Sequence, residues 1–140
     1  MKLHDIMTRE VEVVSPDDSL EDAARRMKEL DVGLMPVCDG QRLVGMLTDR
    51  DITVRAVAEG RDPRKTRVSP VMTAEVVYCF EDQDVEDAAR LMNDRQIRRL
   101  PILDRSKRLT GIVALGDLAV RTRDEELSGR VLEGVSEPAR

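Results

Sequence analysis

The sequence contains one motif written twice. An offset of 65 residues places the run EDAAR at 21–25 on the identical run at 86–90, and an offset of 66 later in the chain places Asp51 on Asp117. Each copy has about 60 residues, which is too few to bury a large core alone. A two-fold repeat of this size therefore predicts two similar halves that share one core within 140 residues.

The chain is almost free of aromatic side chains. Tyr78 and Phe80 are the two aromatic residues, and there is no Trp. We therefore expect a core of aliphatic residues and methionine, and a planar ligand would have to lie between aliphatic side chains. Single-stranded nucleic acids bind on aromatic platforms, and the net charge of −5 comes from an acidic excess in both halves. No nucleic-acid partner is expected.

The absence of long apolar runs and the low cysteine content predict a cytoplasmic protein. The chain has no apolar run near the ~20 residues that span a bilayer, and its first residues lack the apolar stretch of a signal peptide, so no membrane partner is expected. Cys38 and Cys79 are too few for a disulfide framework or a CxxC-type zinc site. We expect two small buried residues in strands, and a cysteine-based redox or stress-response protein with no nucleotide ligand is the alternative. The single histidine, His4, has no companion ligands, so no metal or catalytic site is predicted.

Each copy has the pattern strand, helix, strand, strand, helix. In the first copy the expected elements are a strand at 11–14, a helix opening at Ser15-Pro16, strands at 34–38 and 43–47, and a helix from Thr48 to about Glu59. In the second copy they are 76–80, 85–94, 100–103, 109–113 and a helix from about Gly116. The expected division is a first motif at 1–60, a polar linker at 61–67, a second motif at 68–122 and a C-terminal helix or tail at 123–140. Together these form one globular domain of the α+β class.

The candidate chemistry lies where a strand runs directly into a helix. Thr48 and Asp51 stand at such a point, where backbone N–H groups favour an anion and a carboxylate can accept hydrogen bonds from a vicinal diol. Thr48 and Asp51 also have the spacing of a capping box, which is a purely structural alternative. In the second copy Ala114 replaces the threonine while Asp117 persists. This difference favours a role for the carboxylate beyond capping.

These motifs resemble a known family. The sequence Leu-Thr-x-x-Asp-Ile at 47–52, the h-Pro-h strands at 35–37 and 100–102, and the Met-Thr openings at 5–8 and 71–73 are similar to a tandem cystathionine-β-synthase (CBS) domain pair, or Bateman module. The resemblance covers about residues 5–122. It implies two βαββα motifs packed with pseudo-two-fold symmetry in a sandwich-like α+β fold. In that family the clefts between motifs typically bind AMP, ADP, ATP, NAD or S-adenosylmethionine and regulate another protein.

The resemblance also implies roles for particular residues. Asp51 and Asp117 would hold ribose hydroxyls, and Thr48 would contact ribose or phosphate. Phosphate would meet the basic side chains of Arg98 and Arg99. Arg50 would join them, and the alternative for Arg50 is a surface ion pair. The aliphatic residues that would clamp adenine are Val11, Met35 and Pro36 at one site and Val76, Leu100 and Pro101 at the other.

The two expected sites are unequal. Ala114 and Gly116 replace polar residues of the family pattern in the second copy, and the first copy has Gly33-Leu34 where the second has its arginine pair. The resemblance implies a non-catalytic sensing module whose regulatory ligand is an adenine nucleotide, with or without Mg²⁺, and no covalent cofactor. The sequence has no Ser-His or Cys-His pairing that would indicate an enzyme. The expected partners are a second copy, bound through 52–58 and 118–120, and a regulated protein whose identity the sequence does not give.

Overall fold

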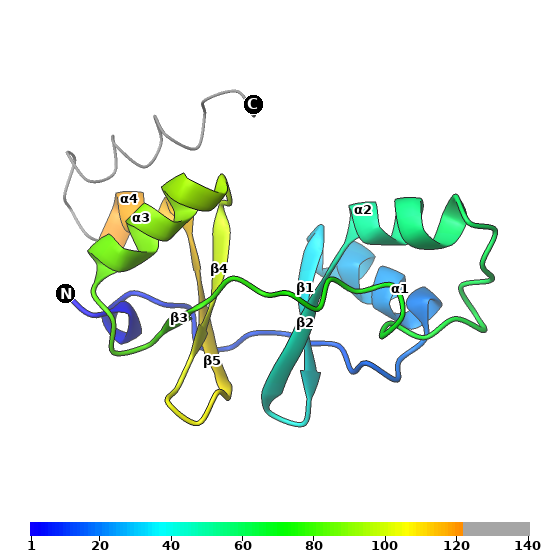
Figure 1. Ribbon diagram of the computed structural model, residues 1–140, viewed down its shortest axis with the longest axis horizontal. Helices are drawn as coiled ribbons and strands as arrows, with labels where there is room; N and C mark the ends of the chain where they lie inside the picture. Colours follow the sequence, from blue (N-terminus) through cyan, green and yellow to red (C-terminus); the bar gives the residue numbers. More distant parts are fainter. Residues whose placement is uncertain (122–140) are drawn as a thin grey trace. The chain divides into compact units, whose positions relative to one another are not determined.

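The computed structural model describes residues 1–121, which form two compact units (Figure 1). Unit 1 contains Met1–Val11 and residues 77–121, and unit 2 contains Glu12–Val76. The mixture of helices and small sheets confirms the α+β class. Since residues 122–140 lie outside the described part, the expected tail at 123–140 does too.

Unit 2 is built on a two-stranded antiparallel ladder. Its elements are α1 (Leu20–Leu30), β1 (Leu34–Asp39), β2 (Arg42–Thr48), the short α2 (Asp49–Asp51) and the π-helical segment η2 (Ile52–Val57). Single bridges extend the ladder on both sides, because Val14 pairs with Val37 in parallel and Thr73 pairs with Met46 in antiparallel. Unit 2 thus has four adjacent rows of extended chain.

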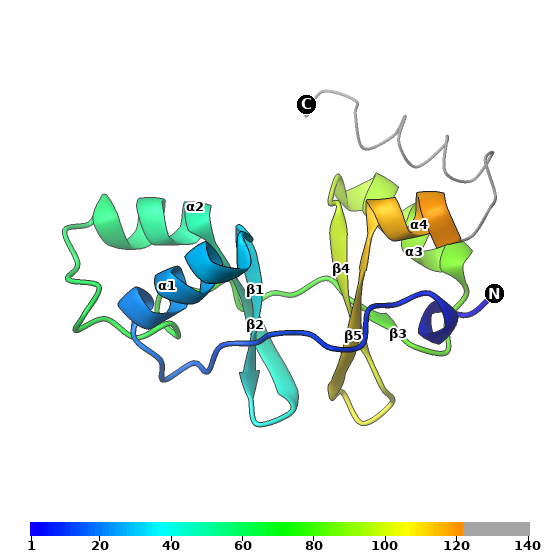
Figure 2. The same ribbon diagram turned by 180° about the vertical axis from the view of Figure 1, so that it is seen from behind.

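Unit 1 repeats this arrangement. Its elements are η1 (Leu3–Asp5), β3 (Cys79–Phe80), α3 (Val85–Arg95), β4 (Arg99–Leu103), β5 (Leu109–Ala114) and α4 (Leu115–Arg121). Strand β3 pairs with β4 in parallel, and β4 pairs with β5 in antiparallel. Thr8 forms the fourth row by bridging Ile112, and Figure 2 shows the N-terminal segment alongside β5.

Two expected elements of the first copy were wrong. The helix expected at Ser15-Pro16 begins instead at Leu20, because Ser15 and Asp18 form a turn in which the Asp18 carboxylate accepts from the Ser15 N–H at 2.8 Å. Ser19 is the N-cap, and its hydroxyl accepts from the Asp22 N–H at 3.1 Å. The expected strand at 11–14 is reduced to the single bridge of Val14.

The compact units do not coincide with the two copies of the repeat. The N-terminal segment of the first copy, 1–8, packs in unit 1, and the matching segment of the second copy, 66–73, packs in unit 2. We call these two stretches the exchanged segments. Each segment closes the first turn of a helix from the other copy: the Val85 N–H donates to the Met1 carbonyl at 3.1 Å, and the Leu20 N–H donates to the Thr66 carbonyl at 2.9 Å. The segments thus satisfy backbone donors that a helix start leaves unpaired.

Each unit has a cluster of buried hydrophobic residues that forms its core. Leu3 and Ile6 from the N-terminal segment belong to the core of unit 1, with α3, β4 and β5. Val68 and Val71 have the same role in unit 2, with α1, β1 and β2. Leu3, Ile6, Val68 and Val71 are at most 2% exposed, so each core depends on the exchanged segment.

Two glycines allow the exchanged segments to approach the strands. A Cβ at Gly111 would lie 2.6 Å from the Met7 sulfur and 2.9 Å from the Thr8 carbonyl oxygen. At Gly45 the corresponding distances are 2.6 Å to the Met72 sulfur and 2.9 Å to the Thr73 carbonyl oxygen. The repeated glycine is therefore explained by close backbone packing.

This packing predicts opposite effects for one substitution at two positions. Gly111→Ala should lower the free energy of unfolding by about 1–3 kcal/mol, because its methyl group meets a backbone oxygen that a side-chain rotation cannot move. Gly116→Ala, on α4 with open space around it, should raise the free energy of unfolding by about 0.5–1 kcal/mol. Chemical denaturation measures both values. Equal effects of the two variants would contradict the close approach at Gly111.

Candidate ligand site at the strand–helix junctions

In unit 2, β2 runs directly into α2, and Thr48 is both the last strand residue and the N-cap. The Asp51 N–H donates to Thr48 Oγ1 at 3.0 Å, and the Thr48 N–H donates to Asp51 Oδ2 at 3.0 Å. The capping box considered from the sequence is therefore present. It fixes the carboxylate at the junction without using all of its acceptor capacity.

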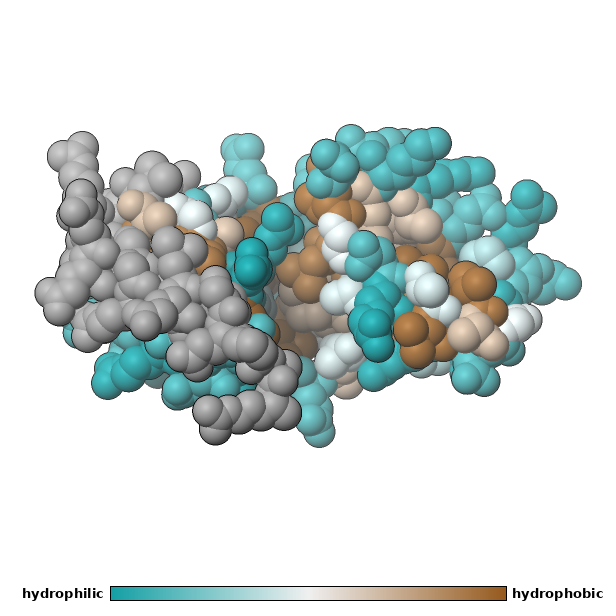
Figure 3. Space-filling model, turned by 90° about the horizontal axis from the view of Figure 1, so that it is seen from above, coloured by the Kyte–Doolittle hydropathy of each residue, from teal (hydrophilic) through white to brown (hydrophobic). Residues whose placement is uncertain are grey.

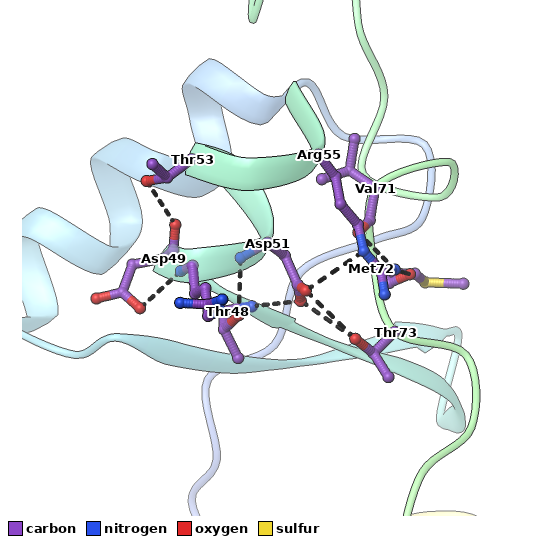
Figure 4. Close-up of polar contacts among 9 residues, drawn as sticks. Thr48, Asp49, Asp51, Thr53, Arg55, Val71, Met72 and Thr73 are labelled. Carbon is purple, nitrogen blue, oxygen red and sulfur yellow. Dashed lines mark hydrogen bonds and ion pairs between the residues drawn. The ribbon is translucent and has the colours of Figure 1, made fainter. Parts of the chain in front are cut away.

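Two further residues surround the Asp51 carboxylate (Figure 4). Thr73 Oγ1 lies 3.3 Å from Asp51 Oδ1 and 3.4 Å from Oδ2, and Arg55 Nε lies 3.9 Å from Oδ1. The Asp51 side chain is 12% exposed. Sequence reasoning missed both residues, although the i,i+4 spacing of Asp51 and Arg55 was a usable signal. Thr73 carried no such signal, because it reaches the site through the segment exchange.

Arg55 also fixes the exchanged segment of unit 2. One of its guanidinium nitrogens, Nη1, donates to the Met72 carbonyl at 3.1 Å and lies 3.5 Å from the Val71 carbonyl. Figure 4 shows this side chain reaching from η2 to the segment. The carboxylate of Asp51 and the backbone at 71–72 are therefore contacted by the same arginine.

The junction of unit 1 keeps half of this arrangement. The Ala114 N–H donates to Asp117 Oδ2 at 2.8 Å, although Ala114 has no hydroxyl to complete a capping box. The Leu115 N–H donates to the Arg98 carbonyl at 2.8 Å, and Arg99 pairs with Ala114 in the β4–β5 register. The backbone positions of Arg98 and Arg99 are thus brought next to the Asp117 junction. In unit 2 the same place is taken by Gly33, whose carbonyl accepts from the Asp49 N–H at 2.9 Å.

The remaining predicted site residues are divided between the units. Met35 and Leu100 are buried in the two hydrophobic cores, and Pro36 and Pro101 are buried beside them in β1 and β4. Val11 belongs to unit 1 and Val76 to unit 2, so neither lies in the unit that contains the other two residues of its expected adenine clamp. Arg50, Arg98 and Arg99 are exposed.

Both cysteines are free and buried, Cys38 in β1 and Cys79 in β3. Burial raises the pKa of each thiol from 9.0 to about 11, and at Cys79 the nearby Asp87 carboxylate adds to this. A thiol with a raised pKa carries little thiolate at neutral pH. The expectation of two small buried residues in strands is confirmed.

The buried thiols predict a slow reaction and a loss of stability at high pH. At pH 8 the thiolate fraction, and with it the rate of reaction with an aromatic disulfide reagent, should be about 100-fold lower in the folded than in the unfolded chain. The folded pKa is above the unfolded one, so this contribution to stability is complete below pH 9 and is lost as the pH rises through about 11. Thiol release followed by absorbance tests the rate, and native thiols that react as fast as those of the unfolded chain would contradict it.

Residues 1–121 offer no metal cluster and no membrane span. Groups of three or more His, Cys, Asp or Glu placed to hold a metal ion are absent from this part of the chain. None of its helices has the length and apolar character needed to cross a bilayer.

The comparison with known proteins shows the family. The CBS domain family matches twice, at residues 3–57 and 68–122. The chain is 48% identical over 132 residues to the CBS domain-containing protein YhcV of Bacillus subtilis, covering 94% of this chain and 93% of that protein. The chain therefore belongs to the CBS domain family, as its motifs suggested.

Solved structures show the same fold. Hypoxic Response Protein I, crystallised with two coordinated zinc ions, superposes with a TM-score of 0.79 at 34% identity, covering 86% of this chain and 98% of that chain. CBSX2, crystallised in complex with AMP, superposes with a TM-score of 0.74 at 28% identity, covering 86% of this chain and 95% of that chain. Two solved structures that share this fold thus contain different bound groups, zinc ions in one and AMP in the other.

Proposed function

We propose that this protein is a non-catalytic sensing module that binds an adenosine-containing ligand at its strand–helix junctions. The carboxylates of Asp51 and Asp117 would accept hydrogen bonds from the ribose hydroxyls. Thr48 and Arg50 would assist in unit 2, and Arg98 and Arg99 would meet phosphate in unit 1. Aliphatic rather than aromatic contacts would hold the adenine, with AMP, ADP, ATP, NAD and S-adenosylmethionine as the candidate ligands and Mg²⁺ as a candidate companion of phosphate.

One observation carries this proposal: the same carboxylate stands at the same strand–helix junction in both units, although the capping threonine stands in only one. Asp117 accepts from the Ala114 N–H at 2.8 Å, as Asp51 accepts from the Thr48 N–H at 3.0 Å. A carboxylate that recurs without the full capping box supports a use of that carboxylate beyond capping. The AMP complex of the related CBSX2 supports an adenine nucleotide as the first ligand to test.

A thermal-unfolding screen tests the proposal. The candidates are adenosine, AMP, ADP, ATP, NAD and S-adenosylmethionine, each with and without Mg²⁺. A ligand that binds only the folded chain, supplied at a concentration 100 times its dissociation constant, adds about 2.7 kcal/mol to the free energy of unfolding. It therefore raises the melting temperature. We expect at least one adenosine compound to do so, with guanosine compounds as the control. A melting temperature unchanged by every compound would overturn the proposal.

The proposed assembly is a homodimer that transmits ligand binding to a regulated protein. Val54 and Val57 on η2 are 46% and 64% exposed, and Figure 3 shows apolar side chains among polar ones on this face of unit 2. Exposed apolar residues on one helix are typical of contact surfaces. A ligand that prefers one arrangement of such a dimer would shift its population and so carry a signal.

The cysteine-based alternative has less support. A redox function needs an accessible thiolate of low pKa, whereas Cys38 and Cys79 are 5% and 2% exposed with raised pKa values. The same two free thiols are compatible with the reducing cytoplasm, which is the location we propose.

A further inference from the structure

We propose that Thr73 is a positioning residue that holds the Asp51 carboxylate in the orientation a ribose diol requires. This inference rests on the proposed function, since it assigns to Thr73 the preparation of that site. It concerns a residue from the second copy of the repeat that acts on a carboxylate from the first.

The acceptor capacity of Asp51 leaves room for a ligand. An ionised carboxylate has about four lone-pair positions. The Thr48 N–H occupies one at 3.0 Å, and the Thr73 hydroxyl is shared between the two oxygens at 3.3 and 3.4 Å. Arg55, at 3.9 Å, contributes charge without a close hydrogen bond. The remaining positions can accept two hydroxyl groups without displacing Thr48 or Thr73.

Thr73 supplies a constraint that Thr48 does not. The bond from the Thr48 N–H anchors Oδ2 alone, and one bond restrains rotation about the Cβ–Cγ bond only loosely, because that torsion has a broad energy profile. Thr73 approaches both oxygens and so selects one rotation of the carboxylate plane. Figure 4 shows the Thr73 hydroxyl facing Asp51 from the exchanged segment.

The position of Thr73 is itself fixed by the backbone. Its N–H donates to the Met46 carbonyl at 2.8 Å, and its carbonyl accepts from the Met46 N–H at 2.9 Å. Arg55 holds the preceding Met72 carbonyl at 3.1 Å. A hydroxyl on a segment held in this way can orient a carboxylate at little cost in side-chain entropy.

A double-mutant cycle tests the contact without a ligand. Thr73→Val and Asp51→Ala are measured singly and together by chemical denaturation, and we expect the unfolding equilibrium constants to be coupled by about threefold to tenfold. Thr53→Val is the matched control, because the Thr53 hydroxyl bonds the Asp49 carbonyl at 3.0 Å rather than Asp51, and its coupling to Asp51→Ala should be smaller. Additive effects of Thr73→Val and Asp51→Ala would overturn the proposal whether or not a ligand binds.

A ligand titration tests the positioning itself. In a chain carrying Asp117→Ala, so that only the Asp51 junction is measured, calorimetry compares adenosine with 2′-deoxyadenosine. Thr73→Val should lower the preference for adenosine about fivefold, because a carboxylate free to rotate engages the diol less well. Thr73→Ser, which keeps the hydroxyl, should restore the preference, and Thr53→Val should leave it unchanged.

The outcomes separate the two claims. A chain that binds no adenosine compound overturns the proposed function, and the double-mutant cycle then still decides whether Thr73 holds Asp51. A chain that binds adenosine with the same preference in Thr73→Val keeps the proposed function and overturns the positioning role.

Discussion

Reversing the charge of Arg98 and Arg99 together should abolish most of the affinity of this protein for ATP while leaving its affinity for adenosine nearly unchanged. Both side chains are exposed, and their backbone lies against the start of α4, the helix that carries Asp117. A charge-assisted contact to phosphate contributes about 1.5–3 kcal/mol, so Arg98→Glu with Arg99→Glu should weaken ATP binding by at least about tenfold. Calorimetric titration with ATP and with adenosine measures both affinities.

The control must reproduce the change in net charge. Lys28→Glu with Arg42→Glu makes the same change at exposed positions of unit 2, and it should lower ATP affinity only through the general field of the protein. Raising the salt concentration should remove that general effect and keep the local one. Equal losses of ATP affinity in the two double variants at high salt would show that Arg98 and Arg99 do not contact phosphate.

Leu3→Ala should lower the free energy of unfolding of the unit that contains it by about 2–5 kcal/mol. Leu3 is 0% exposed and belongs to the core of unit 1, although it lies near the beginning of the chain, where substitutions are often harmless. The large effect follows from the segment exchange, which makes the N-terminal residues part of a core completed by α3, β4 and β5. Denaturation monitored by circular dichroism measures the loss.

Leu30→Ala is the matched control for Leu3→Ala. Leu30 is 42% exposed at the end of α1, and the same truncation there should change the free energy of unfolding by less than about 0.5 kcal/mol. A harmless Leu3→Ala variant would mean that the N-terminal segment does not complete the core of unit 1.

The strands and helices with strong patterns were predictable from the sequence. The expected strands at 34–38, 43–47, 100–103 and 109–113 match β1, β2, β4 and β5 within one or two residues. The start of α1 was not predictable from the sequence. Ser15-Pro16 has the chemistry of a helix start as well as that of a turn, and Ser19 is a second candidate for the N-cap. The π-helical form of η2 also has no signature in the residue pattern.

The exchange of segments could not be read from the repeat. An alignment of two copies shows which residues are equivalent, but it is silent on which copy completes which core. Met7 and Met72 align with each other whether each packs in its own copy or in the other, and only the contacts with Gly111 and Gly45 distinguish the two cases.

Only the part of the candidate site that is local in sequence was predictable. Thr48 and Asp51 are neighbours in sequence, so their capping box followed from spacing alone. Thr73, 22 residues further along the chain, reaches Asp51 through the exchanged segment and carried no local signal.

Isothermal titration with AMP shows whether Asp51 and Asp117 hold an adenosine compound, as proposed. We predict saturable binding to the unmodified chain, loss of one class of site in Asp51→Ala and in Asp117→Ala, and no binding when both are changed in a chain that still unfolds cooperatively. Binding of AMP that persists with both carboxylates removed would show that Asp51 and Asp117 do not hold the ligand.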